Sequence, residues 1–132
     1  MPIVVEALNE VTYQDQHDLQ KIYLDAPDWL LAPQQSPEQL VESLLHEGSL
    51  IAARFNDRLL GAARLERTPD IWHLSHLCVR KITRRRGVAE RMVHEAQRHA
   101  RQAGAQLRLC VPAGQPEAQA LAAKLHLSVD VL

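Results

Sequence analysis

Apolar and polar side chains follow each other along the chain in two different rhythms. Continuous or alternating apolar runs predict strands, whereas apolar positions that recur every three or four residues predict helices. The predicted strands are residues 2–8, 50–55, 58–65, 71–79, 107–111 and 127–132, and the predicted helices are residues 12–26, 36–48, 87–103 and 115–125. This β-α-α-β-β-β-α-β-α-β order predicts an α+β (α/β) fold, in which a mixed central sheet carries helices on both faces.

Local signals support several of these elements. Thr12 and Ser36 stand where a side chain can cap a helix, and each is followed three residues later by a residue that completes a capping box. Asn56 and Asp57 tolerate a positive φ, so they predict a two-residue hairpin turn between two strands. The strand–helix–strand unit over residues 71–111 predicts a right-handed parallel crossover.

The composition is that of an ordinary globular chain. Of its 132 residues, 46% are hydrophobic and 23% are charged, so we expect one domain over residues 1–132 with its own core. No apolar run approaches the roughly 18 residues of a membrane span, and the first residues do not resemble a secretion signal, which favours a cytoplasmic protein. The net charge of −1 gives no reason to expect nucleic-acid or membrane binding. Cys78 and Cys110 lie far apart in apolar segments, which is typical of reduced, packed thiols.

Basic residues gather where a predicted strand leads into a predicted helix. Five of the seven residues from 80 to 86 are Arg or Lys. The first turn of the following helix carries unpaired N–H groups and a partial positive charge, which attract phosphate. Gly87 and Ala89 leave the main chain there open to an anion. These residues predict a pyrophosphate site, and a solvated basic turn explains them equally well.

The same segment resembles a motif of a known superfamily. Arg84-x-x-Gly87-x-Ala89 is similar to the acetyl-CoA motif (Q/R-x-x-G-x-G/A) of the GNAT acetyltransferases, and the element order of the chain resembles the GNAT fold. The resemblance implies acetyl-CoA (CoA) as the cofactor, with its pyrophosphate on the main-chain amides of residues 84–89. Its pantetheine arm would pair with the preceding strand, where that strand separates from the one at 107–111. The cofactor-binding residues implied in this way are Leu77, Cys78, Val79, Arg84, Arg85, Arg86, Gly87, Val88 and Ala89.

Three longer stretches, residues 15–22, 52–60 and 79–88, are similar to the PanZ/PanM family of GNAT-fold acetyl-CoA sensors. That resemblance implies a protein that binds the aspartate decarboxylase zymogen of pantothenate synthesis, promotes its self-cleavage and couples it to the CoA level. By position, Arg54 and Asn56 would contact this partner. The same residue types are also typical of an exposed strand and a tight turn, so both interpretations stay open.

The chain also differs from the pattern of that family. The segment Pro27–Gly48 is longer than the family's connection and carries a well-capped helix, and Leu132 falls short of the family's last strand. In GNAT enzymes the first of these regions covers the acceptor amine. The differences favour an alternative function, an N-acetyltransferase that moves acetyl from acetyl-CoA to a small-molecule or protein amine.

Candidate catalytic groups are few. The last helix lacks the tyrosine that many GNAT enzymes use as an acid. The candidates for a base are His73, Ser75 and His76, because an imidazole with a pKa near neutrality suits that role. Strand alternation places His73, Ser75, Leu77 and Val79 on one face and His76 on the other, unless a bulge intervenes. Each histidine is also typical of a sheet-face residue that bonds to a neighbour.

No metal site is expected from the sequence. His94 and His99 are five residues apart, which turns them to different faces of a helix, and His73 and His76 would point to opposite sides of a strand. The chain contains no nucleophile elbow and no Gly-rich nucleotide loop of the known spacings.

Overall fold

The computed structural model describes residues 3–27, 29–31, 35–83, 87–111 and 114–131. Within these ranges the elements are β1 (Val4–Ala7), α1 (Tyr13–Leu24), α2 (Pro37–Glu47), β2 (Leu50–Phe55), β3 (Arg58–Arg67), β4 (Ile71–Val79), α3 (Val88–Gln102), β5 (Gln106–Val111), α4 (Pro116–Lys124) and β6 (Ser128–Val131). A short 3-10 helix, Lys81–Thr83, follows β4. The predicted order of strands and helices is confirmed.

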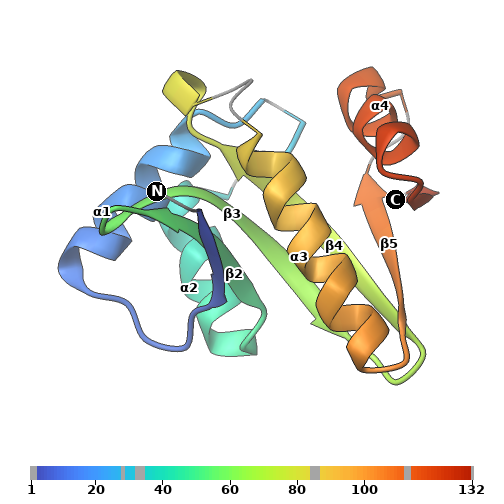
Figure 1. The fold of residues 1–132 in the computed structure, drawn as a ribbon. Helices are drawn as coiled ribbons and strands as arrows, with labels where there is room; N and C mark the ends of the chain where they lie inside the picture. The colour runs from blue at the N-terminus through green and yellow to red at the C-terminus, as the bar shows by residue number, and fades with distance from the viewer. Residues whose placement is uncertain (1–2, 28, 32–34, 84–86, 112–113, 132) are drawn as a thin grey trace.

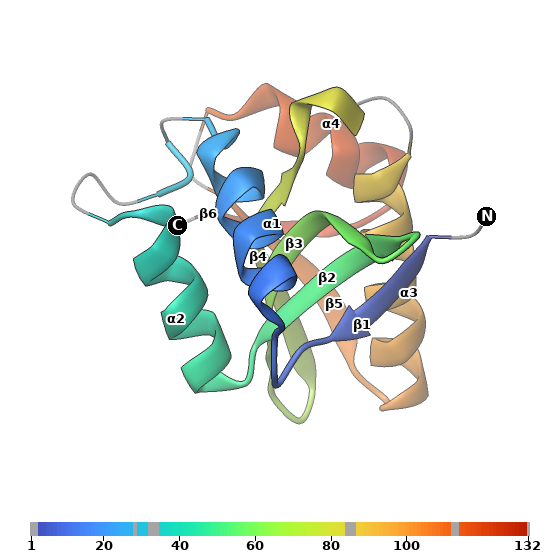
Figure 2. The same cartoon turned by 90° about the vertical axis from the view of Figure 1, so that its left-hand side faces the viewer.

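The strands form one mixed sheet in the order β1-β2-β3-β4-β5-β6. Neighbours from β1 to β4 are antiparallel, whereas β4–β5 and β5–β6 are parallel. Helices α1 and α2 cover one face and α3 covers the other, so the sheet lies between them in Figure 2. Helix α4 lies at the β5–β6 side of the sheet (Figure 1). None of the helices in the described part of the chain is long and apolar enough to cross a bilayer.

Side-chain chemistry sets the ends of the first helices and of the hairpin. The hydroxyls of Thr12 and Ser36 accept hydrogen bonds of 3.0 and 3.1 Å from the N–H groups three residues later, and both capping boxes are complete. Asn56 and Asp57 have φ values of 48° and 64° between β2 and β3. These are the positive angles that a two-residue hairpin turn requires. The predicted caps and the predicted turn are confirmed.

Buried apolar residues of the described chain fall into two clusters, one on each face of the sheet. Gly61 of β3 allows α3 to approach closely. A Cβ added at Gly61 would lie 2.9 Å from Sδ of Met92 and 3.2 Å from Cγ1 of Val88. Gly61 pairs with Val79, the last residue of β4. The missing side chain therefore lets the first turns of α3 pack directly over the end of β4.

Charge pairs between buried carboxylates and partly exposed arginines join α1 to the β2–β3 hairpin. The carboxylate of Asp18 is fully buried and accepts hydrogen bonds from Nη2 of Arg58 at 2.7 Å and from the N–H of Leu59 at 3.1 Å. One turn earlier, Asp15 accepts a hydrogen bond of 3.0 Å from Nη1 of Arg54. Burial alone would raise the pKa of Asp18, but the bonds from Arg58 and Leu59 outweigh burial and hold this pKa below its ordinary value of 3.8.

Replacing Asp18 measures how much the hydrogen bonds of this carboxylate to Arg58 and Leu59 contribute to the stability of the fold. We expect Asp18→Ala to lower the free energy of unfolding by about 3 kcal/mol at neutral pH, because it leaves the buried N–H of Leu59 without its acceptor. Asp18→Asn keeps an oxygen acceptor and should cost less. Denaturant unfolding followed by circular dichroism measures both values, and an Asp18→Ala protein as stable as the wild type would contradict the assignment.

The lowered pKa of Asp18 also predicts how its contribution to stability changes with pH. A carboxyl group with a lower pKa in the folded state stabilises the protein above its unfolded pKa, and this stabilisation is lost as the pH falls through the folded pKa. The stability difference between the wild type and Asp18→Asn should therefore narrow as the pH falls below 3.8. A difference that widens in acid would show that the carboxylate has no stabilising partner.

Candidate functional site

A cleft opens where β4 and β5 separate. The two strands pair from Ile71–Gln106 to Leu74–Leu109, and beyond that point the described residues form no further β4–β5 pairs. Figure 1 shows the strands diverging on the side where α4 and the start of α3 lie. The cleft has a volume of about 250 Å³. Its lining consists of residues 75–79 and 109–111, Ala89 of α3, Glu117, Ala118 and Leu121 of α4, and Pro27, Trp29 and Leu30 after α1.

A β-bulge shapes the β4 wall of this cleft. The register of the β3–β4 ladder shifts, so that His76 and Leu77 of β4 together oppose Ala63 of β3. His76 has a φ of 53°, in the left-handed region that a residue other than glycine seldom adopts. The hydroxyl of Tyr23 in α1 donates a hydrogen bond of 2.8 Å to the carbonyl oxygen of His76. Helix α1 therefore holds the bulge in place through this hydrogen bond.

The bulge changes which side chains of β4 share a face. Val79 packs with Leu74 in the cluster under α3, and Leu77 lies against the same cluster. Regular alternation would group His73 and Ser75 with Leu77 and Val79, but the bulge, the exception that the sequence left open, places the two pairs on different faces. The extra residue at the bulge reverses the alternation beyond it, so side chains on its two sides exchange faces.

Ser75 and His76 line the cleft, whereas His73 does not. Nδ1 of His76 lies 3.2 Å from Oγ of Ser75, which is within hydrogen-bond distance. Burial lowers the pKa of His76 below its ordinary value of 6.5, and the charge of Arg64 lowers it further, while the carboxylate of Glu47 partly opposes both. The imidazole is therefore neutral at neutral pH and able to accept a proton.

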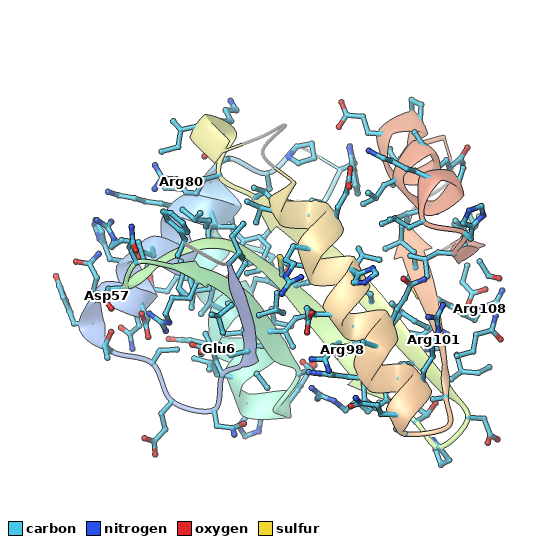
Figure 3. All side chains as sticks on the ribbon, in the orientation of Figure 1. Glu6, Asp57, Arg80, Arg98, Arg101 and Arg108 are labelled. Atoms are coloured by element: carbon cyan, nitrogen blue, oxygen red, sulfur yellow. The ribbon has the colours of Figure 1, made fainter. Side chains whose placement is uncertain are left out.

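His73 has the other predicted role, that of a sheet-face histidine bonded to a neighbour. Its Nε2 lies 3.1 Å from Oδ2 of Asp130 in β6. The same carboxylate accepts a hydrogen bond of 2.6 Å from Nη2 of Arg108 in β5. Figure 3 marks Arg108 on the opposite side of the molecule from Asp57 and the hairpin. His73, Arg108 and Asp130 thus form a polar group across three neighbouring strands, next to the cleft.

The start of α3 lies beside the cleft, because Ala89 of its first turn is part of the lining. Gly87 precedes the helix with a φ of 78°, which glycine adopts without strain. No side chain among the described residues caps this end of α3. The N–H groups of its first turn can therefore donate hydrogen bonds to a ligand. Val88 is buried in the core. Arg84–Arg86 lie outside the described residues, so their part in a pyrophosphate site stays a prediction.

No disulfide joins Cys78 and Cys110 in the described chain. Cys78 is buried, and its Sγ donates a hydrogen bond of 3.2 Å to the carbonyl of Ile22. Burial raises the pKa of the half-buried Cys110, and the charges of Asp130 and Glu66 raise it further. A protonated thiol is a weak nucleophile, so Cys110 is poorly suited to covalent catalysis.

The predicted partner residues lie on the β2–β3 hairpin. The guanidinium of Arg54 donates hydrogen bonds of 2.9 Å to Glu6 and 3.0 Å to Asp15. These bonds, above all the one to Asp15, raise the pKa of Arg54. Asn56 is exposed at the turn, and Figure 3 shows the adjacent Asp57 at the outer end of the hairpin. Arg54 is thus held in a fixed position, whereas Asn56 is open to solvent.

Sequence reasoning missed Tyr23 as a residue that shapes the site. Its ring is 1% exposed within the α1 cluster, and burial raises the pKa of its hydroxyl well above the ordinary value of 10.0. A tyrosine buried in this way stays protonated and needs a hydrogen-bond acceptor. Its place on the apolar stripe of α1 indicated that Tyr23 is buried. Nothing in the sequence identified the carbonyl of His76 as the acceptor of its hydroxyl.

Solved structures match this architecture. A ribosomal-protein-alanine N-acetyltransferase from Brucella melitensis biovar Abortus 2308 superposes with a TM-score of 0.74 at 17% identity, over 99% of this chain and 94% of the other. An aminoglycoside 6′-N-acetyltransferase complexed with coenzyme A superposes with a TM-score of 0.61 at 16% identity, over 80% of this chain and 60% of the other. The mixed sheet with its diverging parallel strands is therefore the fold of the GNAT acetyltransferases.

Sequence similarity narrows this class to one family. The acetyltransferase (GNAT) domain family PanZ matches residues 2–128. A PanD regulatory factor from Escherichia coli (strain K12) is 36% identical over 99 residues, which cover 75% of this chain and 69% of that protein. The chain belongs to the PanZ family, and the resemblance that its sequence indicates is confirmed.

The surroundings of His76 predict how it titrates. We expect its imidazole to titrate below pH 6.5, because burial and Arg64 both disfavour the charged form. Arg64→Gln should raise this pKa, since it removes the cation and releases Glu47, whose Oε2 accepts a hydrogen bond of 2.9 Å from Arg64. Imidazole chemical shifts followed by NMR across pH measure both values.

Arg67→Gln is the matched control. It removes the same charge from the same strand, but the guanidinium of Arg67 lies over the ring of Trp72, 5.3 Å from its centroid. This variant should leave the titration of His76 nearly unchanged. Equal shifts in the two variants would mean that the general charge of β3, and not Arg64, sets the pKa of His76.

Proposed function

We propose that this chain binds acetyl-CoA in the β4–β5 cleft and promotes self-cleavage of the aspartate decarboxylase zymogen. The observation that carries the first part is the β4 segment from Ser75 to Val79, which lines the cleft without a β5 partner in the described chain. The second part rests on membership of the PanZ family and on the similarity to a protein named PanD regulatory factor.

The cleft fits the pantetheine arm of CoA. An extended arm carries amide groups, which can pair with a main chain as an added strand does, here along β4 beyond its last pair with β5. The walls of the cleft include the apolar side chains of Leu109, Val111 and Leu121, which suit the methylene groups of the arm. When bound, acetyl-CoA would supply an acetyl thioester next to Ser75 and His76.

The start of α3 fits the diphosphate of the same cofactor. Its first N–H groups have no side-chain cap among the described residues, and Gly87 places no side chain over them. Helix N-termini of this kind bind phosphate because their free N–H groups and the helix dipole act together. Arg84, Arg85 and Arg86 would add guanidinium donors to the phosphate oxygens. A solved acetyltransferase of the same fold, complexed with coenzyme A, supports this choice of ligand.

The β2–β3 hairpin fits a protein partner. Asn56 is exposed at its tip, and Arg54 is oriented by Glu6 and Asp15 before any partner arrives. A cation already fixed in place loses little conformational entropy on binding. We assign the contact with the decarboxylase zymogen to Arg54 and Asn56.

Replacing Gly87 tests the phosphate position. Gly87→Val should weaken acetyl-CoA binding at least tenfold, about 1.4 kcal/mol, because a branched side chain would stand over the first N–H groups of α3. Isothermal titration calorimetry measures the affinity. Gly104→Val is the control, because Gly104 has a φ of 75° beyond the other end of α3 and, like Gly87, no atom within 4 Å of an added Cβ.

Both substitutions impose a similar backbone strain, so thermal melts should show similar losses of stability. Only Gly87→Val should lose affinity. If the two variants bind acetyl-CoA equally well, the diphosphate does not lie at the start of α3.

A cleavage assay tests the partner. Purified zymogen should cleave itself faster in the presence of this protein and acetyl-CoA than with either one alone. Asn56→Gly should abolish the acceleration while the hairpin stays folded, because glycine readily adopts the φ of 48° at this position. Asp57→Gly, at a φ of 64° in the same turn, controls for any loosening of the hairpin.

Calorimetry on Asn56→Gly separates the two parts of the proposal. Unchanged acetyl-CoA affinity together with lost acceleration assigns Asn56 to the partner surface. An unchanged cleavage rate in the presence of the wild-type protein would remove the decarboxylase function and leave cofactor binding intact.

Ser75 and His76 favour a second candidate function, N-acetyl transfer to an amine. In that reaction the amine nitrogen attacks the thioester carbonyl, the C–S bond breaks, His76 accepts the proton of the amine, and water protonates the departing thiolate. A neutral imidazole that lines the cleft suits this role. The release of free thiol from acetyl-CoA, measured with a panel of amines, tests this second function. Thiol release that an amine stimulates and that His76→Gln abolishes supports acetyl transfer. Thiol release no faster than background hydrolysis with every amine excludes it.

A further inference from the structure

Three side chains that can each ligate a metal ion lie close together on the sheet beside the cleft. His73 lies on β4, Cys110 on β5 and Asp130 on β6, which are neighbouring strands. One donor atom from each residue lies within 4.8 Å of the other two. All three side chains are half-buried, so the group is reached from solvent.

The spacing of these atoms is close to that of a metal site. Zinc bonds of about 2.0 to 2.3 Å in tetrahedral geometry place neighbouring donor atoms about 3.3 to 3.8 Å apart. Nε2 of His73 is 3.1 Å from Oδ2 of Asp130, so this pair already has nearly the separation of two ligands. The sulfur of Cys110 needs a displacement of no more than about 1 to 1.5 Å to complete the set.

We propose that His73, Cys110 and Asp130 form a zinc site with one open coordination position. An imidazole nitrogen, a thiolate and a carboxylate oxygen are all zinc ligands, and a set with one of each suits zinc better than magnesium or calcium. The thiol of Cys110 would release its proton to solvent as the metal–sulfur bond forms. The side chains of His73 and Asp130 are 31% and 35% exposed, so a water molecule can fill the fourth position.

Arg108 orients the carboxylate ligand. Its Nε donates to both oxygens of Asp130 at 2.9 Å, and its Nη2 donates to Oδ1 at 2.6 Å. Oδ1 can keep its bond to Nη2 while Oδ2, the oxygen nearer to His73, turns to the metal. A hydrogen bond to the outer oxygen of a ligating carboxylate is a common support of metal sites. The positive charge of Arg108 also opposes a dication, so we expect weaker binding than in a closed four-cysteine site.

Cobalt(II) is the probe for this site, because it replaces zinc in such donor sets and is coloured. Titration of the reduced protein should give a near-ultraviolet thiolate-to-cobalt charge-transfer band that saturates at one ion per chain, and zinc should displace it. Cys110→Ser should abolish this band. Cys78→Ser should keep it, because the buried Sγ of Cys78 is bonded to the carbonyl of Ile22 on α1.

The other two ligands are tested by affinity. His73→Gln and Asp130→Asn should each weaken cobalt binding at least about tenfold. His94→Gln, a change on α3 outside the donor group, should leave it unchanged. Circular dichroism confirms that the variants are folded.

Three outcomes would overturn the proposal. They are the absence of a sulfur-to-cobalt band in the wild type, a band that survives in Cys110→Ser, and equal weakening by His94→Gln and His73→Gln. The readout needs no acetyl-CoA and no partner, so it stands or falls separately from the proposed function.

Discussion

The cleft depends on the break in the regular pairing of β4 with β3, the bulge at His76. Parallel strands that keep their pairing leave no space between them, and here β4 and β5 pair only as far as Leu74 and Leu109. The extra residue of the bulge bends and twists β4 just beyond this point. A buried carbonyl without a hydrogen-bond donor costs about 1 to 3 kcal/mol, and the hydroxyl of Tyr23 donates to the part-buried carbonyl of His76 at the bulge, which offsets this cost.

The hairpin and the cleft are built on different physical principles. The hairpin is held by charge, because Asp15 and Asp18 of α1 bind Arg54 and Arg58. The cleft is lined mainly by apolar side chains and by the main chain of one strand. A surface of fixed charges suits recognition of another protein, whereas an apolar channel with a few polar groups suits a small ligand.

The sequence predicted what short-range chemistry decides. Thr12 and Ser36 cap their helices, and Asn56 and Asp57 make the turn, because each acts within a few residues. The separation of β4 and β5 followed from the family resemblance. The position of the bulge, the acceptor of the Tyr23 hydroxyl and the grouping of His73 with Cys110 and Asp130 were not predicted, since they depend on how distant strands and helices align. Alternation along a strand could not detect an inserted residue.

Helix α1 contacts both parts of the molecule through its two ends. Asp15 near its start holds Arg54, and Tyr23 near its end holds the carbonyl of His76. The helix has 12 residues, a length of about 18 Å at 1.5 Å per residue. A rod of this length cannot tilt at one end without moving the other. The hairpin and the β4 wall are therefore joined through one helix, which sets the separation between Arg54 and the carbonyl of His76.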